Sequence, residues 1–212
     1  MRPRVLLADD HKIVSEGLRS LLEPDYELVG MVEDGRAMVA AAEKLSPDVI
    51  VADISMPLLN GIEAARQLKK ANSRAKIVFL TMHPDVTYAT RAFEAGASGY
   101  VLKHAASSEL VTAIKEVLRG RMYITPMITK DVLKFFMDSP QKPRKDDSEL
   151  TPRQREVLQL VVEGRSAKEI ASILHISTRT VEFHKYRMME ELGLRTNADL
   201  IQYAIKHHLT SV

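Results

Sequence analysis

Five polar residues stand at the ends of short apolar runs, and their types are those that handle phosphoryl groups and divalent cations. They are Asp9, Asp10, Asp53, Thr81 and Lys103. Carboxylates suit a hard cation such as Mg²⁺, and a carboxylate beside a metal ion can act as a nucleophile toward an activated phosphoryl group. A hydroxyl can donate a hydrogen bond to a phosphoryl oxygen, and an ammonium group can neutralise its charge. Together they predict a phosphoryl-transfer site, provided that the fold gathers them.

The apolar runs indicate the elements that position these residues. The runs are rich in β-branched residues and comprise Val5–Ala8, Val49–Ala52, Ile77–Leu80 and Tyr100–Leu102. Short runs that alternate with longer amphipathic stretches are typical of buried parallel strands separated by helices. In an open parallel sheet, sites form in the crevice beyond the carboxyl ends of the strands. We therefore expect the five polar side chains to converge there.

Strand and helix signals alternate from Arg4 to about Arg119. The strands are expected to begin near Arg4, Tyr26, Asp48, Lys76 and Gly99. The helices are expected near Lys12–Leu22, Arg36–Lys44, Ile62–Lys70, Val86–Ala95 and Ser107–Leu118. Five such units predict a doubly wound α/β domain, with a five-stranded parallel sheet and helices on both faces.

The composition changes near residue 138. The stretch from Asp138 to Glu149 is polar, holds two prolines and has almost nothing to bury, which indicates a linker. Thr125–Met137, just before it, has the pattern of one more helix. We expect a first domain over residues 1–121, a linker that includes this helix over 122–149, and a second domain over 150–212.

After residue 150 only helix signals remain. Thr151 can cap a helix, with Gln154 placed to close a capping box. Ser166 and Glu169 repeat this device, and Ser177 can cap a third helix. The helices are expected over 152–163, 167–174, 178–191 and 197–207. The tight join between the second and third is typical of a small all-α helix-turn-helix domain.

The composition excludes several classes of protein. With 45% hydrophobic residues and a formal net charge of +2, the chain is expected to be globular, with no global charge that demands nucleic acid or an acidic membrane. It has no cysteine, which excludes disulfides, cysteine-based zinc sites and thiol catalysis. No apolar run approaches the roughly 18 to 20 residues that span a bilayer. A strand-like segment begins at Arg4, so we also expect no signal peptide and a cytoplasmic location.

Taken alone, each polar residue has an ordinary explanation, such as a helix cap for Asp-Asp, but their joint placement at successive strand ends is harder to dismiss.

Two enzyme classes fit the sequence poorly. An aspartate-nucleophile phosphatase usually needs a second acid two residues after the nucleophile, where Ser55 stands. A nucleotide-binding dehydrogenase needs a glycine-rich turn after the first strand, but residues 9–12 contain no glycine. We therefore do not expect an enzyme.

The first domain resembles the receiver domain of two-component response regulators over about residues 3–121. The matching residues are Asp9-Asp10, Asp53 with Met56-Pro57 after it, Thr81, Tyr100 and Lys103. The resemblance implies a flavodoxin-like strand order of 2-1-3-4-5. His104 stands where many receivers have a proline, but the role of the lysine does not need that proline.

The same resemblance implies a role for each site residue. Asp53 accepts a phosphoryl group from the phosphohistidine of a sensor histidine kinase, and Lys103 neutralises charge. Thr81 and Tyr100 form a switch pair, in which the threonine turns toward the phosphate and the aromatic ring follows inward. Mg²⁺ is held by Asp10, Asp53 and the backbone carbonyl of Ser55, and Asp9 helps, often through water.

The second domain resembles the LuxR-type helix-turn-helix over about residues 150–207, and the whole chain resembles the NarL/FixJ subfamily of transcription regulators. The matching residues are Leu150–Leu158, Gly164, Ser166, Lys168–Ala171, Leu174, Ile176–Ser177, Thr180–Val181 and His184. The resemblance implies that the helix over 178–191 lies in the major groove of double-stranded DNA. It also implies a homodimer when the chain is phosphorylated and contact with RNA polymerase.

We expect the DNA contacts along the recognition helix and the dimer contacts on the last helix. The candidate DNA contacts are Thr178, Arg179, Thr180, Glu182, Phe183, Lys185, Tyr186 and Arg187. The last helix carries Leu200, Ile201 and Ala204 on a stripe that faces either a partner copy or the core of its own domain.

The charges of the second domain leave two alternatives open. Nine Lys and Arg residues stand against seven Asp and Glu residues after residue 149, a modest excess for binding phosphates. Glu182 stands where family members commonly carry lysine. It either accepts a hydrogen bond from cytosine N4 in the major groove or faces solvent and weakens binding. The rival to a DNA-binding regulator is a signalling adaptor whose helical tail binds protein.

Overall fold

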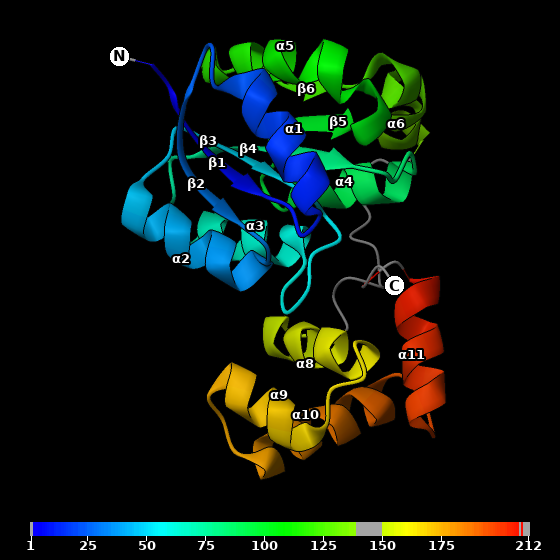
Figure 1. Ribbon diagram of the computed structural model, residues 1–212. Coiled ribbons are helices and arrows are strands. Elements are labelled where there is room, and N and C mark those ends of the chain that lie inside the picture. Colours follow the sequence, from blue (N-terminus) through cyan, green and yellow to red (C-terminus); the bar gives the residue numbers. More distant parts are fainter. Residues whose placement is uncertain (1, 139–149, 208, 210–212) are drawn as a thin grey trace. The chain divides into compact units, whose positions relative to one another are not determined.

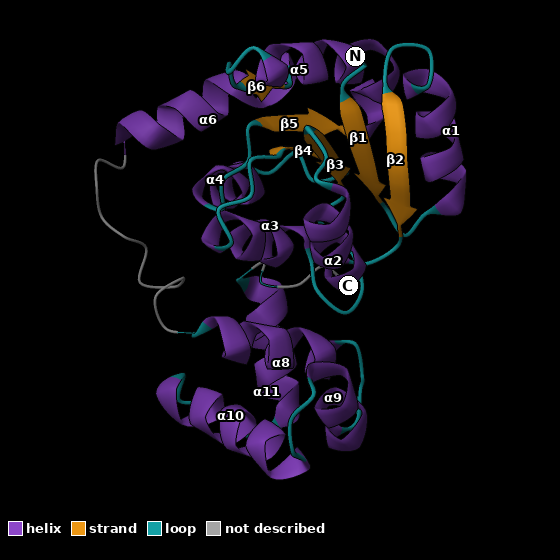
Figure 2. Ribbon diagram, turned by 90° about the vertical axis from the view of Figure 1, so that its left-hand side faces the viewer, coloured by secondary structure: helices purple, strands orange, loops and turns teal. Residues whose placement is uncertain are grey.

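The computed structural model describes residues 2–138, 150–207 and 209. It divides into two compact units, residues 1–140 and 141–212. The first unit is a layered α/β structure, and the second is made of helices (Figures 1 and 2). The predicted linker over residues 139–149 lies outside the described residues.

The first unit is built on a parallel sheet of six strands in the order β2-β1-β3-β4-β5-β6. The strands are β1 (Arg4–Ala8), β2 (Glu27–Val32), β3 (Val49–Ala52), β4 (Lys76–Thr81), β5 (Gly99–Leu102) and β6 (Tyr123–Ile124). The doubly wound fold and the order of its first five strands are confirmed. The strand count was wrong by one, because β6 extends the sheet beyond β5. A strand of two residues is too short for a hydrophobic pattern to reveal.

Helices cover both faces of this sheet (Figure 1). They are α1 (Lys12–Leu22), α2 (Gly35–Leu45), α3 (Gly61–Lys70), α4 (Val86–Glu94), the short 3₁₀ helix η1 (Lys103–Ala105), α5 (Ala106–Leu118) and α6 (Pro126–Asp138). Helices α1 and α5 pack on one face, whereas α2, α3 and α4 pack on the other. The inner strands are almost wholly apolar and buried, as expected for parallel strands that are covered on both sides.

Helix α6 packs on the first unit, in residues that the sequence assigned to the linker. The predicted helix over Thr125–Met137 is present, and its Ile128 and Val132 are buried in the same core as the α4 residue Ala92. Thr125 fixes the start of the helix, since its hydroxyl accepts a hydrogen bond from the backbone of Leu102 at 3.1 Å and donates one to Glu109 at 2.8 Å. The first unit therefore continues past the predicted boundary at residue 121.

The second unit holds α8 (Pro152–Val162), α9 (Ala167–Leu174), α10 (Thr178–Glu191) and α11 (Asn197–Lys206). The two predicted capping boxes are present, and Thr196 with Asp199 forms a third at the start of α11. His175 lies between α9 and α10 with a φ of 53°, which gives the tight left-handed turn of a helix-turn-helix. Val157, Ile170 and Met188 contribute to the small buried core.

Among the described helices of the two units, we find none with the length and apolar character that a membrane crossing requires.

Candidate functional site

Three of the five predicted site residues come into direct contact at the carboxyl edge of the sheet. The Nζ atom of Lys103 lies 2.8 Å from an oxygen of Asp53 and 2.7 Å from an oxygen of Asp9. All three side chains are largely buried, so these ion pairs are shielded from water. Asp10 lies beside Asp9 and is more exposed. Thr81 is fully buried at the end of β4.

The pairing of β1 with β3 explains why distant acids meet. Ala8 and Ala52 are register partners, and the amide of Asp53 donates to the carbonyl of Ala8 at 2.8 Å. Asp53 therefore leaves β3 beside the point where Asp9 leaves β1. The backbone amide of Ile54 then donates to the Asp53 carboxylate at 2.6 Å, which sets the orientation of the side chain.

Opposing effects act on the ammonium group of Lys103. Burial alone would lower the pKa of Lys103. The hydrogen bonds to Asp53 and Asp9, together with the attraction of their charges, outweigh burial and raise that pKa. The lysine is therefore charged at neutral pH.

The acidic side chains form a cluster that could hold a metal ion. Oxygens of Asp9, Asp10 and Asp53 and a ring nitrogen of His11 all lie within 4.8 Å of one another. The Nδ1 atom of His11 is 2.8 Å from Asp10, and its backbone amide donates to Asp9 at 2.9 Å. The sequence prediction did not include His11, although its place next to Asp9-Asp10 and its ability to bind metals were available signals.

His83, in the loop after β4, contacts three of the predicted site residues. Its Nε2 atom lies 2.9 Å from the hydroxyl of Ser55, and its backbone amide donates to the hydroxyl of Thr81 at 3.3 Å. Its carbonyl accepts a hydrogen bond from the hydroxyl of Tyr100 at 2.8 Å, and its ring stacks on Tyr88 at 4.1 Å. No sequence motif pointed to this histidine, because its contacts arise only from the folded loop.

Tyr100 is fully buried, with its ring inside the unit. Burial raises the pKa of its hydroxyl far above the ordinary value, and the nearby Asp85 adds to the effect. The hydroxyl is therefore neutral and donates to His83.

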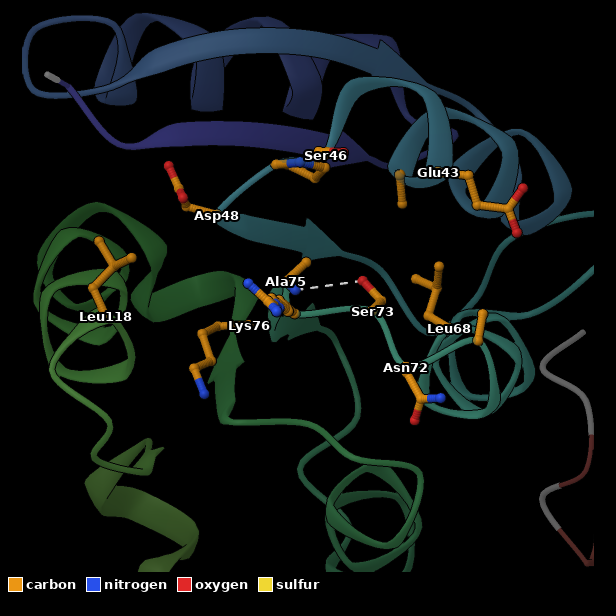
Figure 3. A pocket seen from close by; sticks show the side chains of 13 residues that line it. Glu43, Ser46, Asp48, Leu68, Asn72, Ser73, Ala75, Lys76 and Leu118 are labelled. Carbon is orange, nitrogen blue, oxygen red and sulfur yellow. Dashed lines mark hydrogen bonds between the residues drawn. The ribbon is translucent and has the colours of Figure 1, made fainter.

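A cleft of about 680 Å³ lies at the opposite edge of the sheet, where β3 and β4 begin (Figure 3). Asp48 and Lys76 line it beside the ends of α2 and α3, together with Ser73. Because the acidic cluster lies at the carboxyl ends of the strands, this cleft is separate from it.

Most of the predicted DNA contacts lie on the accessible surface of α10. Five of the eight are exposed and three are partly buried; the exposed ones are Thr178, Arg179, Phe183, Tyr186 and Arg187, and the partly buried ones are Thr180, Glu182 and Lys185. Lys185 forms an ion pair with Glu182 at 2.9 Å. Arg187 forms another with Glu191, also at 2.9 Å.

The three residues of the predicted dimer face differ in exposure. Leu200 and Ala204 have no exposed surface, because they pack within the core of the second unit. They are therefore not available to a partner in this structure. Ile201 is partly exposed, as is Ile205 one turn later. A helical stripe in a sequence does not distinguish core packing from a partner contact.

An acidic cluster at the carboxyl edge of a parallel sheet, followed by a helix-turn-helix unit, defines a two-domain signalling protein that binds DNA. Residues 5–115 match the response regulator receiver domain, and residues 148–204 match the bacterial regulatory proteins of the luxR family. The chain belongs to the two-component response regulators of the NarL/FixJ type, with a LuxR-type DNA-binding domain.

Relatives with this architecture are transcriptional regulators. The transcriptional regulatory protein DegU of Brevibacillus brevis is 34% identical over 220 residues, which cover 96% of this chain and 93% of DegU. The oxygen regulatory protein NreC of Staphylococcus carnosus is 33% identical, with 97% and 98% covered. A solved structure of two RcsB dimers bound to two parallel DNAs is 28% identical, covers 97% of this chain and 98% of that chain, and gives a TM-score of 0.60. These findings favour the DNA-binding regulator over the signalling adaptor.

Proposed function

We propose that Asp53 is the phosphoacceptor of this transcriptional regulator and that a sensor histidine kinase supplies the phosphoryl group. The observation that carries the proposal is the buried contact of Asp53 with Lys103 at the end of β3. A carboxylate oxygen of Asp53 attacks the phosphorus of the kinase's phosphohistidine, and the phosphorus–nitrogen bond breaks as the imidazole leaves. The ammonium group of Lys103 then pairs with the new phosphoryl oxygens instead of the carboxylate.

The donor set of the pocket fits Mg²⁺. Three carboxylates face one ammonium group, which leaves two negative charges for a divalent cation to balance. The residues that would hold the ion are Asp9, Asp10, Asp53 and, through its backbone carbonyl, Ser55. When bound, Mg²⁺ neutralises charge on the phosphoryl group during its transfer.

Thr81 and Tyr100 connect the phosphorylated site to the rest of the molecule. The hydroxyl of Thr81 gives up its contact with the amide of His83 to donate to a phosphoryl oxygen. Tyr100 follows because its hydroxyl is bound to the same loop residue. Phosphorylation thereby shifts an equilibrium between two conformations of the loop after β4.

We assign DNA binding to α10, in the cytoplasm and in the form of a homodimer. One helix-turn-helix makes a small footprint, so useful specificity normally takes two half-sites. The likeness to RcsB, which was solved as dimers on DNA, supports this assignment. A regulator of this kind acts on transcription through RNA polymerase, which is therefore a proposed partner.

Labelling with a small-molecule phosphodonor and Mg²⁺ tests the phosphoacceptor. The wild-type chain should take up one label, and Asp53→Asn should take up none. Asp25→Asn makes the same chemical change at an exposed acid on the surface and should be labelled like the wild type. Undiminished label in Asp53→Asn would refute the assignment.

The salt dependence of binding to promoter fragments tests the DNA assignment. A protein that contacts phosphates loses affinity steeply as salt rises, because binding releases counterions. Binding should strengthen after phosphorylation in the wild type but not in Asp53→Asn. Absence of binding at low salt, with or without phosphorylation, would contradict the assignment.

A further inference from the structure

The groove-facing surface of the recognition helix α10 is aromatic and acidic as well as basic. Val181 and Met188 are buried against the other helices of the unit, which fixes the inner face of α10. On the opposite face, Phe183 and Tyr186 are 56% and 68% exposed. Glu182 lies between the inner and outer faces, since successive residues of a helix are separated by about 100°. Its side chain therefore lies at the edge of the surface that a DNA groove would meet.

The ion pair between Glu182 and Lys185 orients both side chains. The side chain of Lys185 is 19% exposed and that of Glu182 is 38% exposed. Both residues line a cleft of about 260 Å³ that is also bounded by Asn197 and Ile201 of α11. The lysine is thus the more deeply placed member of the pair, and the carboxylate is the more accessible one.

We infer that Glu182 selects a cytosine in each half-site, with Lys185 as its countercharge. The inference rests on the proposed DNA binding by α10. A carboxylate can only accept hydrogen bonds, and in the major groove only the amino groups of cytosine and adenine donate them. Adenine places the acceptor N7 beside its amino group, which repels a carboxylate, whereas cytosine has no acceptor there. The carboxylate therefore favours cytosine over all three other bases.

Lys185 explains how an acidic residue is tolerated at a DNA-binding surface. An unpaired carboxylate would be repelled by the phosphates on both sides of the groove. The ammonium group lies 2.9 Å from Oε2 of Glu182 and offsets this repulsion, while 38% of the glutamate side chain remains exposed. The pair thus keeps the carboxylate accessible as an acceptor and reduces the electrostatic penalty of placing it near phosphates.

A matched pair of full-length variants tests the inference. Glu182→Gln keeps the size of the side chain but adds an amide donor, which suits the N6 and N7 groups of adenine. Glu190→Gln makes the same charge change at an exposed position near the other end of α10, away from the amino-terminal residues that reach base edges. Circular dichroism of each variant confirms that the helices are retained.

The measurement is selection from a random DNA pool, with Mg²⁺ and a small-molecule phosphodonor present. The wild type should enrich cytosine about tenfold or more at one position of each half-site. Glu182→Gln should move the preference at that position to adenine and leave the other positions unchanged, while Glu190→Gln should keep the cytosine. An unchanged base profile in Glu182→Gln overturns the inference while the proposed DNA binding stands. If the wild type selects no sequence and binds no DNA at low salt, the proposed function fails as well.

Discussion

The hydroxyl of Tyr100 donates a hydrogen bond to the backbone carbonyl of His83, 2.8 Å away. The amide of the same histidine donates to the hydroxyl of Thr81. One loop residue therefore touches both members of the proposed switch pair through its backbone. Loss of the contact between Thr81 and this amide would free the loop residue whose carbonyl holds Tyr100.

Replacing Tyr100 with phenylalanine should destabilise the protein by about 1 kcal/mol, because the ring stays buried while one hydrogen bond is lost. Tyr186→Phe removes the same hydroxyl from an exposed ring and should change stability by less than about 0.5 kcal/mol. Urea unfolding of the full chain measures both. Equal effects of the two substitutions would show that the contact with His83 contributes nothing.

Gly61 allows α3 to begin against Asp53, the proposed phosphoacceptor. A Cβ atom at this position would lie 2.1 Å from the carbonyl oxygen of Asp53 and 2.9 Å from the ring of Phe79. Gly61→Ala should therefore cost about 2 kcal/mol or more of stability and slow the labelling of Asp53, since the backbone must move.

Gly17→Ala is the control for that substitution. A Cβ atom at Gly17 meets nothing within 4 Å, and alanine is the better helix former, so stability should rise by about 0.5 to 1 kcal/mol. If Gly61→Ala unfolded at the same urea concentration as the wild type, the close approach of α3 to Asp53 would not limit the side chain at this position, and the prediction would be wrong.

The sequence predicted the acidic site better than it predicted the edges of the fold. Parallel strands carry their carboxyl ends to one place, so Asp9 and Asp53 could be brought together from strand positions alone. The contacts of His83 depend on the conformation of one loop. The spacing of apolar residues predicts helices and strands but not the conformation of a loop. Likewise, the spacing of Ile128 and Val132 indicates a helix but not the helix α4 on which it packs.

Removing the charge of Lys103 should destabilise the protein, because the carboxylates of Asp9 and Asp53 are then left buried together without a countercharge. Lys103→Met, in a buffer without divalent cations, should lose about 3 kcal/mol of unfolding free energy. Lys12→Met breaks only an exposed pair with Glu33 and should lose less than about 0.5 kcal/mol.

Magnesium should stabilise Lys103→Met more than it stabilises the wild type. The proposed Mg²⁺ site exists only in the folded cluster of carboxylates, and in the variant no ammonium group competes for them. Melting temperatures with and without Mg²⁺ measure this difference. An equal gain in the two proteins would contradict a shared position for the metal and the lysine.

Helix α6 should behave as part of the first unit. Ile128 is buried against the core that includes α4, so Ile128→Ala should cost about 2 to 4 kcal/mol. Met127→Ala, at the exposed neighbouring position, should change stability by less than about 0.5 kcal/mol. Urea unfolding followed by a probe in the first unit separates the two. Similar small effects would mean that α6 is only a connection.

We expect His184 to make the second unit sensitive to mild acid. Burial lowers the pKa of its imidazole below the ordinary value of 6.5, and the charges of Arg153 and Arg187 lower it further. At pH values between the pKa of the folded state and the ordinary pKa, the unfolded chain binds more protons than the folded one, so stability falls as the pH drops below about 6.5.

An NMR titration should therefore place the midpoint of His184 below 6.5, and Arg187→Gln should raise this midpoint while Arg179→Gln should not. Unfolding at pH 7.5 and at pH 5.5 should show a larger loss of stability in the wild type than in His184→Gln. A midpoint at or above 6.5 would mean that neither burial nor the two arginines lower the pKa of this ring.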